Sequence, residues 1–472
     1  METKIEQEQS FYKLVLKIAL PVTLQSLLQS SFSVIDQVMT GQLGSYSIAG
    51  IGLGGKFSSI YSVLVSTIAA VAGIMIAQYM GKRDSREVSR SFYLNMLLAV
   101  CLAVVFTGIC IFFPKYIMGI YTKDVLTRDI AAGYLQIIAF SYLPMAVTTL
   151  FATLLRCMEA ASLPLYASVF SAVVNTGLNY LLIFGKLGLP RLEVKGAAIA
   201  TVLSQIAGCA FCVVLFFLIF KRQNAQSGAV LLQRYGKECS VSGIFLNRSG
   251  RNQYLGILLP ILACEFFWSL GENVYTAIYG NMGTDACAAM TLTIPIQVLT
   301  IGALSGLSQA AAILIGKSLG GKAYEKAYQD SKRLMWCGLA GSVLLSLLLA
   351  AAGRFYVQIY QVEEAVRSLA SQILIAFALI SPVKVQNMIL GGGILRSGGK
   401  TRYVMVIDFV GTWLFGVPLG LWAAFVLKLP IPFVYFILSL EECVRFGISL
   451  AVFRKKGWME SIGSMNSVTN EP

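Results

Sequence analysis

Histidine is absent from this sequence of 472 residues, and charged residues make up only 13% of it. Without histidine the chain has no Ser-His-Asp or Cys-His catalytic site and lacks the commonest protein ligand for metals. Soluble domains contain about 25% charged residues, so a soluble globular protein is excluded. Apolar residues instead make up 57% of the chain, and the mean hydropathy is +0.72. We therefore expect an integral membrane protein that is not an enzyme.

Apolar runs long enough to cross a bilayer occur twelve times in the sequence. A helical span needs about 20 apolar residues. The runs begin near residues 14, 52, 91, 129, 164, 196, 253, 287, 333, 365, 404 and 431. The sequence therefore predicts an all-α membrane protein with twelve transmembrane helices.

The basic surplus, a net charge of +14, carries topological information. With a cytoplasmic N-terminus, the inside segments hold 24 of the Lys and Arg residues and the outside loops hold 9. Because loop cations are retained on the cytoplasmic side, we expect a multi-pass protein of the plasma membrane with both termini in the cytoplasm. The most basic segment, residues 221–252, fits this topology signal, so we expect no nucleic-acid partner.

The second half of the chain repeats the first half. Five residue pairs are separated by 239 positions: Pro21/Pro260, Gly41/Gly280, Gly44/Gly283, Ala49/Ala288 and Gly81/Gly320. Each half contains six spans, so the halves start on the same side of the membrane and are related by a pseudo-twofold axis along its normal. The predicted domains are an N-terminal six-helix bundle at 1–220, a basic cytoplasmic linker at 221–252, a C-terminal six-helix bundle at 253–455 and a cytoplasmic tail at 456–472. This organisation is typical of alternating-access transporters.

Nucleotide and metal motifs are incomplete in this chain. Gly316-Lys317-Ser318 resembles the end of a phosphate-binding loop, but Ala311 stands where that motif needs a glycine. Cys209 and Cys212 lie in an apolar span and are interpreted as small buried hydrophobic residues. We therefore expect no cofactor and no structural metal.

Ionisable side chains within spans are the candidate functional residues, because placing them in a bilayer is costly. Asp36 on the first span shares one helix face with Gln25, Gln29 and Ser33. We expect this polar stripe to face a central cavity; the alternative role for Asp36 is to fix helix packing through hydrogen bonds. Neutral oxygen atoms that would suit Na⁺ or a carboxylic acid come from the fifth and sixth spans, at Asn175, Asn179 and Thr201.

Acidic residues also occur in the spans of the second half. Glu265 and Glu272 share a face of the seventh span, and we expect at least one of them to meet the cavity, without deciding which. Asp408 and Lys384 are predicted to pair across helices. Within the twelfth span, internal neutralisation is predicted among Glu441, Glu442 and Arg445.

Side chains that could contact a flat organic cation in the cavity include an amide, a thioether and two phenols. We name as candidates Gln29, Tyr61, Met145 and Tyr275. Ordinary packing within a helix bundle is the alternative explanation for the aromatic and sulfur side chains.

The pattern resembles the multidrug and toxic compound extrusion (MATE) family over about residues 12–455. The matching features are Pro21 with Asp36, the turns Gly41-Gln-Leu-Gly44 and Gly280-Asn-Met-Gly283, the Leu-Arg turns at Arg156 and Arg396, and the Asn175/Asn179 pair followed by Gly196-Ala-Ala-Ile-Ala-Thr201. The resemblance implies two six-helix bundles forming a V, with cation-coupled antiport of small organic cations.

The resemblance also implies roles for individual residues. Asp36 would take the coupling H⁺ or Na⁺, with Asn175, Asn179 and Thr201 as its partners, and Glu265 or Glu272 would match the second-half acid of some relatives. Some members carry a further acid near the asparagine pair on the fifth span, and this chain has none there. That departure favours H⁺ over Na⁺.

Two other transport functions remain as alternatives. A lipid-linked oligosaccharide flippase of the wider superfamily requires a cationic cavity for pyrophosphate, whereas the stripes found here are acidic and polar. A passive channel would show flux that does not depend on a pH or Na⁺ gradient. Whichever of these functions applies, antiport included, we expect a monomer surrounded by membrane lipid.

Overall fold

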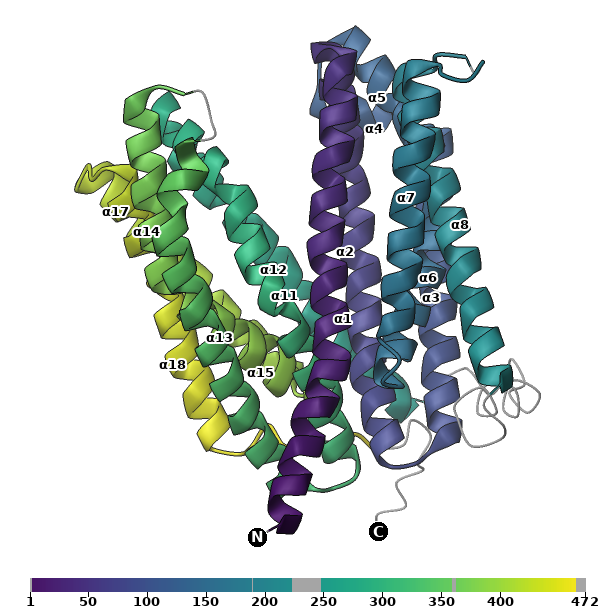
Figure 1. Ribbon diagram of the computed structural model, residues 1–472, viewed down its shortest axis with the longest axis vertical. Helices are drawn as coiled ribbons and strands as arrows, with labels where there is room; N and C mark the ends of the chain where they lie inside the picture. The colour runs from purple at the N-terminus through teal and green to yellow at the C-terminus, as the bar shows by residue number, and fades with distance from the viewer. Residues whose placement is uncertain (1, 189, 223–247, 359–361, 464–472) are drawn as a thin grey trace. The chain divides into compact units, whose positions relative to one another are not determined.

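The computed structural model describes residues 2–188, 190–222, 248–358 and 362–463, and every regular element in these ranges is helical (Figure 1). Eleven helical stretches are long and apolar enough to cross a membrane. The predicted all-α membrane fold is therefore confirmed. Residues 223–247 of the predicted linker and 464–472 of the predicted tail lie outside the described ranges.

The first half of the chain supplies six of the apolar stretches. Its elements are α1 (Glu2–Thr40), η1 (Gly41–Leu43), α2 (Ser45–Gly81), α3 (Ser85–Phe112), α4 (Pro114–Tyr121), α5 (Val125–Ile138), η2 (Ala139–Ser141), α6 (Tyr142–Cys157), α7 (Ser162–Phe184) and α8 (Glu193–Arg222). The fourth span comprises α5, η2 and α6 together.

The second half supplies the other five. Its elements are α11 (Arg248–Asn281), α12 (Thr284–Gly320), α13 (Tyr324–Gln358), α14 (Glu364–Asn387), η3 (Met388–Leu395), α15 (Thr401–Phe409), η4 (Val410–Gly416), α16 (Val417–Leu421), η5 (Trp422–Val426), α17 (Ile431–Ser439) and α18 (Glu441–Arg454). Three of them, η3, η4 and η5, are π-helical. The predicted twelfth span is divided at Leu440 into α17 and α18, both shorter than a full crossing.

Side-chain caps begin two of the first-half helices. The Asp84 carboxylate accepts a hydrogen bond from the backbone N–H of Glu87 at 3.1 Å at the start of α3. Asp124 does the same for Thr127 at 2.9 Å at the start of α5, and hydrogen bonding at Thr127 lowers the pKa of Asp124. Helix α4 lies before the predicted span that begins near residue 129, and it starts at Pro114 because proline is well suited to the first helical turn.

Contacts divide the chain into two compact units. The second-half unit comprises Met1–Thr23, Ala77–Arg83 and Asn247–Pro472, and the first-half unit comprises Leu24–Ile76 and Asp84–Leu246. The division differs from the predicted domains at the start of α1 and the end of α2, which contact the second half. The Thr23 hydroxyl, for example, donates a hydrogen bond to the Ala303 carbonyl of α12 at 3.3 Å.

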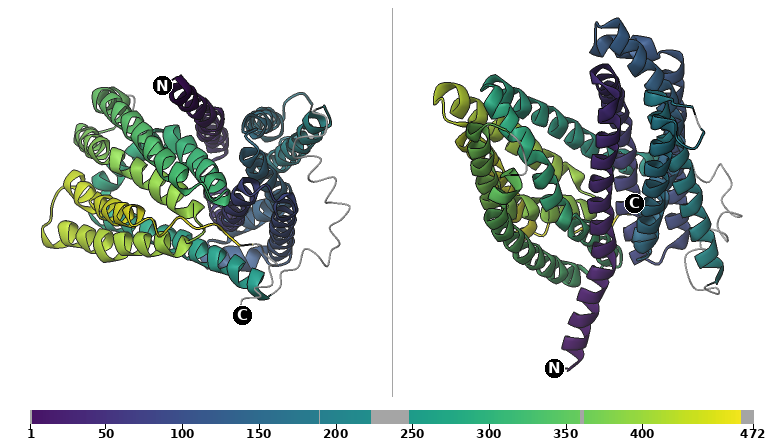
Figure 2. Two further views of the ribbon diagram at one scale, coloured as in Figure 1. Left: turned by 90° about the horizontal axis from the view of Figure 1, so that it is seen from below. Right: turned by 45° about the horizontal axis from the view of Figure 1, so that its top comes forward.

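Each unit has its own apolar core. In the first-half unit Tyr61 and Tyr142 stack with ring centroids 4.3 Å apart, and both are buried. The helices of the second half run from teal through green to yellow in Figure 2, and buried side chains of α11, α12, α13, α14 and α17, among them Phe377, Ile373 and Val434, form the core of the second-half unit. These cores hold the helices that carry the polar residues described next.

Candidate functional site in the first-half unit

Close packing of α7 against α8 brings the polar residues of the fifth and sixth spans together. Helix α7 ends at Gly185 in the left-handed region, with φ of 66°, and the Leu192 N–H then donates back to the Leu182 carbonyl at 2.9 Å. A Cβ at Gly196 would lie 2.7 Å from that same carbonyl, so only glycine permits this approach. The two helices are thereby held side by side (Figure 1).

A chain of hydrogen bonds joins the four residues predicted for cation coupling. The Asn179 Nδ2 atom donates to the Asp36 carboxylate at 2.5 Å and to the Asn175 Oδ1 atom at 3.1 Å. The Asn175 amide in turn donates to the Thr201 hydroxyl at 3.4 Å. Residues from α1, α7 and α8 therefore form one polar cluster within a single unit.

One atom of this cluster has no partner. The Oδ1 atom of Asn179 is buried and accepts no hydrogen bond from any described residue. A buried acceptor that is left unsatisfied costs about 1–3 kcal/mol. The residue that donates to the Asp36 carboxylate therefore also carries an unsatisfied acceptor.

A cavity of about 580 Å³ opens beside this cluster. Asp36, Asn175 and Thr201 line it, together with Gln29 and Met145 from the predicted substrate contacts. Tyr61 does not line it: this side chain is fully buried and its hydroxyl donates to the Tyr142 carbonyl at 2.7 Å. Its aromatic ring therefore serves packing within the bundle.

Arg156 is a cavity residue for which the sequence predicted no function beyond the Leu-Arg turn. Its guanidinium donates to the Gln25 side chain at 3.0 Å, and Gln25 donates to the Ser168 hydroxyl at 2.7 Å. Gln25 lies eleven residues before Asp36 on α1, about 16 Å along the helix axis. The guanidinium is therefore anchored away from the Asp36 carboxylate. The pairing of Arg156 with Arg396 in the repeat was the signal that could have identified it.

The acids of the seventh span lie in different surroundings from Asp36. Glu265 forms an ion pair with Arg396 at 3.3 Å. Glu272 is exposed on α11 and lies within electrostatic range of Lys384. Glu265 is therefore engaged locally, and of the two only Glu272 presents an exposed side chain.

The predicted pair between Asp408 and Lys384 is wrong. Asp408 instead pairs with Arg445, whose Nε donates to the carboxylate at 3.1 Å, and accepts from the Cys264 thiol at 2.7 Å. Lys384 lies 3.9 Å from Glu442, and Glu442 is also 3.6 Å from Arg445. Helical spacing correctly predicted the pair of Glu442 with Arg445 within α18. The partners of Asp408 and Lys384 lie on other helices and depend on how the helices pack.

Tyr275, the remaining substrate candidate, lies in the core of the second-half unit. Its hydroxyl donates to the buried Glu441 carboxylate at 2.5 Å. Gly416 makes room for this contact, because a Cβ there would overlap both the hydroxyl and the carboxylate. The phenol is thus committed to an internal hydrogen bond and is only 5% exposed.

Comparison with known proteins agrees with this architecture. The family model named MatE matches residues 21–181 and again 260–422. The two matches begin 239 residues apart, which is the separation found in the internal repeat. The family model therefore recognises each half of the chain separately.

Relatives cover nearly the whole chain. An uncharacterized transporter of Bacillus subtilis, YisQ, is 21% identical over 447 residues, covering 93% of each chain. The probable multidrug resistance protein NorM of Thermotoga maritima is 24% identical over 423 residues, covering 88% of this chain and 86% of its own. A mutant of the Vibrio cholerae MATE transporter VcmN has a similar fold, with a TM-score of 0.84, 16% identity, and coverage of 96% of this chain and 99% of its own. This chain belongs to the MatE family of multi-pass membrane transporters.

Proposed function

We propose that this transporter exports small organic cations by antiport, with Asp36 carrying the coupling cation. Relatives named as probable multidrug resistance proteins support the substrate class. The hydrogen-bonded cluster of Asp36 with Asn175, Asn179 and Thr201 supports the coupling role. A coupling site requires a group that binds and releases a cation, and a lone carboxylate has this property.

The observation that carries the proposal is the small set of ionisable side chains that line the cavity. Asp36 and Arg156 are the ionisable residues among those that line it, and Arg156 is held at the Gln25 end. Asp36 forms no ion pair with any described residue. Its carboxylate is therefore available to bind a cation, either the coupling ion or the substrate.

The donor arrangement around Asp36 favours H⁺ as the coupling ion. A dehydrated Na⁺ needs several converging oxygen ligands. Here Asn179 turns an N–H toward the carboxylate, and the Asn175 oxygen already accepts a hydrogen bond. A protonated Asp36, by contrast, becomes a donor that the unpartnered Asn179 oxygen can accept from after its carboxamide turns.

Exchange at Asp36 then couples the two fluxes. While Asp36 is ionised, its negative charge favours an amphipathic cation in the cavity beside Gln29 and Met145. Protonation of Asp36 removes that charge, so the substrate is released where protons are abundant. Each conformational cycle therefore exchanges one bound cation for the other at the same carboxylate.

The decisive experiment uses the full chain in sealed vesicles with an imposed pH gradient and a fluorescent organic cation. Asp36→Asn keeps the size of the side chain but removes its proton exchange. We expect gradient-driven efflux to fall to the level of vesicles without protein. Retention of coupled efflux by a folded Asp36→Asn protein would refute the proposal.

Two further arms separate the alternatives. Asp129→Asn, which removes a carboxylate exposed beside Lys115, is the matched control and should leave efflux unchanged. Replacing the pH gradient by a Na⁺ gradient should not drive efflux if H⁺ couples. Flux that ignores both gradients would indicate a passive channel, and transport of a pyrophosphate-linked lipid in place of cations would indicate a flippase.

A further inference from the structure

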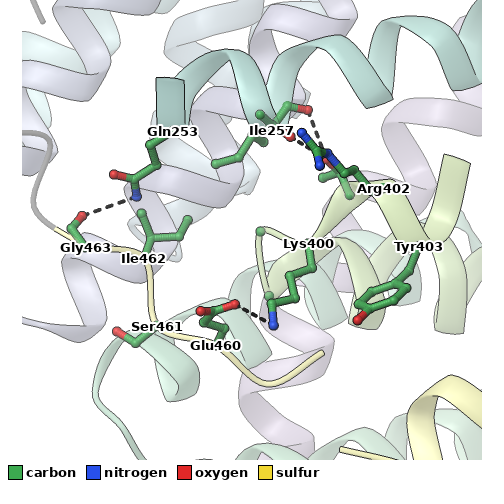
Figure 3. A pocket seen from close by; sticks show the side chains of 13 residues that line it. Gln253, Ile257, Lys400, Arg402, Tyr403, Glu460, Ser461, Ile462 and Gly463 are labelled. Carbon is green, nitrogen blue, oxygen red and sulfur yellow. Dashed lines mark hydrogen bonds and ion pairs between the residues drawn. The ribbon is translucent and has the colours of Figure 1, made fainter. Parts of the chain in front are cut away.

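A second cavity, in the second-half unit, is independent of the site around Asp36. Its volume is about 620 Å³, and residues from three parts of the chain line it: the start of α11, the connection from η3 into α15, and the chain after α18 (Figure 3). The lining residues that matter below are Gln253, Lys400, Thr401, Arg402, Tyr403 and Glu460.

The walls of this cavity are fixed by hydrogen bonds. The Thr401 hydroxyl donates to the Ile257 carbonyl of α11 at 3.1 Å, which fastens the start of α15. The Gln78 side chain accepts from the Ile462 N–H at 2.7 Å and donates to the Ser397 carbonyl at 2.6 Å. Residues 460–463 are thereby tied to the connection that precedes α15.

Further contacts hold the segment that follows α18. Trp458 is fully buried, and its indole N–H donates to the Phe453 carbonyl at 3.2 Å. The Tyr79 hydroxyl and the Gln253 amide both donate to the Gly463 carbonyl, at 3.0 and 3.4 Å. Hydrogen bonds therefore hold each of the segments that line the cavity in place.

Two cations and one carboxylate line the cavity. The Lys400 ammonium pairs with the Glu460 carboxylate at 2.8 Å, and this hydrogen bond raises the pKa of Lys400. Arg402 is exposed and makes no ion pair with any described residue. The Lys400 site is therefore already occupied by an anionic group from the chain itself, while the neighbouring guanidinium retains its full donor capacity.

We propose that this cavity binds the phosphate group of an anionic membrane lipid at Arg402, and that Lys400 joins the contact when the phosphate displaces the Glu460 carboxylate. Guanidinium groups bind phosphate oxygens in a bidentate manner, and an ammonium adds a compact charge. The start of α15 contributes further, since no side chain caps it and its first N–H groups carry partial positive charge.

The location supports a lipid as the source of the phosphate. Lys400 and Arg402 lie before the eleventh predicted span, which begins near residue 404, and the expected cytoplasmic N-terminus places this connection on the cytoplasmic side. Basic pockets between helices on that side recognise anionic headgroups. Tyr403 is 43% exposed at the cavity edge, as is usual for a phenol at a membrane interface. The inference does not depend on which substrate the protein transports.

The test uses the purified full chain in an uncharged detergent, titrated with phosphatidylglycerol or with phosphatidylcholine and followed by native mass spectrometry and thermal unfolding. The double variant Lys400→Gln/Arg402→Gln should bind phosphatidylglycerol about tenfold more weakly, the loss expected when charge-assisted phosphate contacts are removed. Arg454→Gln/Lys455→Gln, which removes two exposed cations that do not line the cavity, should bind like the unaltered protein.

Glu460→Gln is expected to change phosphatidylglycerol binding in the opposite direction. Removal of the carboxylate that occupies Lys400 should tighten phosphatidylglycerol binding, so a folding defect cannot imitate this result. Inorganic phosphate tests the source: displacement of phosphatidylglycerol by millimolar phosphate, with equal thermal stabilisation, would assign the site to soluble phosphate compounds. Equal weakening in both double variants, or equal binding of phosphatidylcholine, would overturn the proposal.

Discussion

The two halves of the chain repeat the same polar link between helices, but with different charges. In the first half Arg156 donates to Gln25, which donates to Ser168. The equivalent residues are Arg396 and Asp408, 240 positions later, and Cys264, 239 positions after Gln25 as in the flanking pairs Pro21/Pro260 and Gly41/Gly280; Arg396 donates to the Cys264 sulfur at 3.2 Å. There Arg396 pairs with Glu265, and the thiol of the preceding residue, Cys264, donates to Asp408.

The difference extends to the positions around Asp36, the proposed coupling acid. Thr201, at the end of the cluster with Asp36, corresponds to Glu441, and Gln205 in the first cavity corresponds to Arg445, both by 240 positions. The second half therefore contains paired acids and bases at this level, since Asp408 and Glu442 both pair with Arg445, while Glu441 accepts a hydrogen bond from Tyr275. Among the residues that the structure describes, Asp36 in the first half has only neutral partners.

This comparison teaches how one fold can hold two kinds of buried polar cluster. Paired charges hold each other in the ionised state and fix helix packing, whereas a lone carboxylate among amides and hydroxyls can change its charge. We therefore propose that the charged cluster of the second half stabilises the fold, which complements the cation exchange proposed for Asp36. The following variants test that division.

The largest effect on stability is expected from Asp408→Asn. Breaking a buried ion pair leaves Arg445 poorly compensated, and such losses cost about 3–5 kcal/mol. Both side chains of this pair are less than one-fifth exposed. We expect the free energy of unfolding, measured by denaturation in detergent, to fall by about 3 kcal/mol.

The matched control for this variant is Asp129→Asn, whose carboxylate is 46% exposed beside Lys115. An exposed pair contributes about 0–1 kcal/mol, so little change is expected. Similar stability of the two variants would break the comparison, because the second-half cluster would then have no structural role.

A smaller loss is expected from Gly416→Ala. The added Cβ would overlap the hydroxyl of Tyr275 and the carboxylate of Glu441, forcing them apart. Overpacking of this kind costs about 1–3 kcal/mol. Thermal unfolding measures it, and Gly447→Ala is the control because a Cβ there meets no neighbour within 4 Å. Equal unfolding temperatures for the two variants would show that the Tyr275 contact is not held by packing.

The smallest effect is expected from Gln25→Glu, which gives the first half the acid that Glu265 supplies in the second. The new carboxylate would face Arg156 at the distance where the amide now accepts, 3.0 Å. Because charge attraction and desolvation oppose each other, we expect a stability change of less than about 1 kcal/mol. Gradient-driven efflux should persist, since Asp36 is about 16 Å away along α1. Loss of efflux in a folded protein would show that the first cavity needs neutral residues throughout.

The sequence predicted the helical fold well because hydrophobic length and loop charge are local properties. The apolar runs that begin near residues 14, 164 and 404, for example, coincide with helices of the structure. The spacing of Glu442 and Arg445 likewise predicted their contact within one helix. The partners of Asp408 and Lys384 were not predictable in this way, because they lie on separate helices whose rotation is set by packing.

The sequence by itself determined the membrane class, the repeat and the scarcity of ionisable groups within spans, since each follows from composition and order. Only the tertiary structure decided which of those groups are neutralised. Asp408 and Glu265 each meet an arginine from another helix, whereas Asp36 meets an amide. The physical reason is that the charge state of a buried acid depends on neighbours brought close by folding, and those neighbours are up to 143 residues away along the chain.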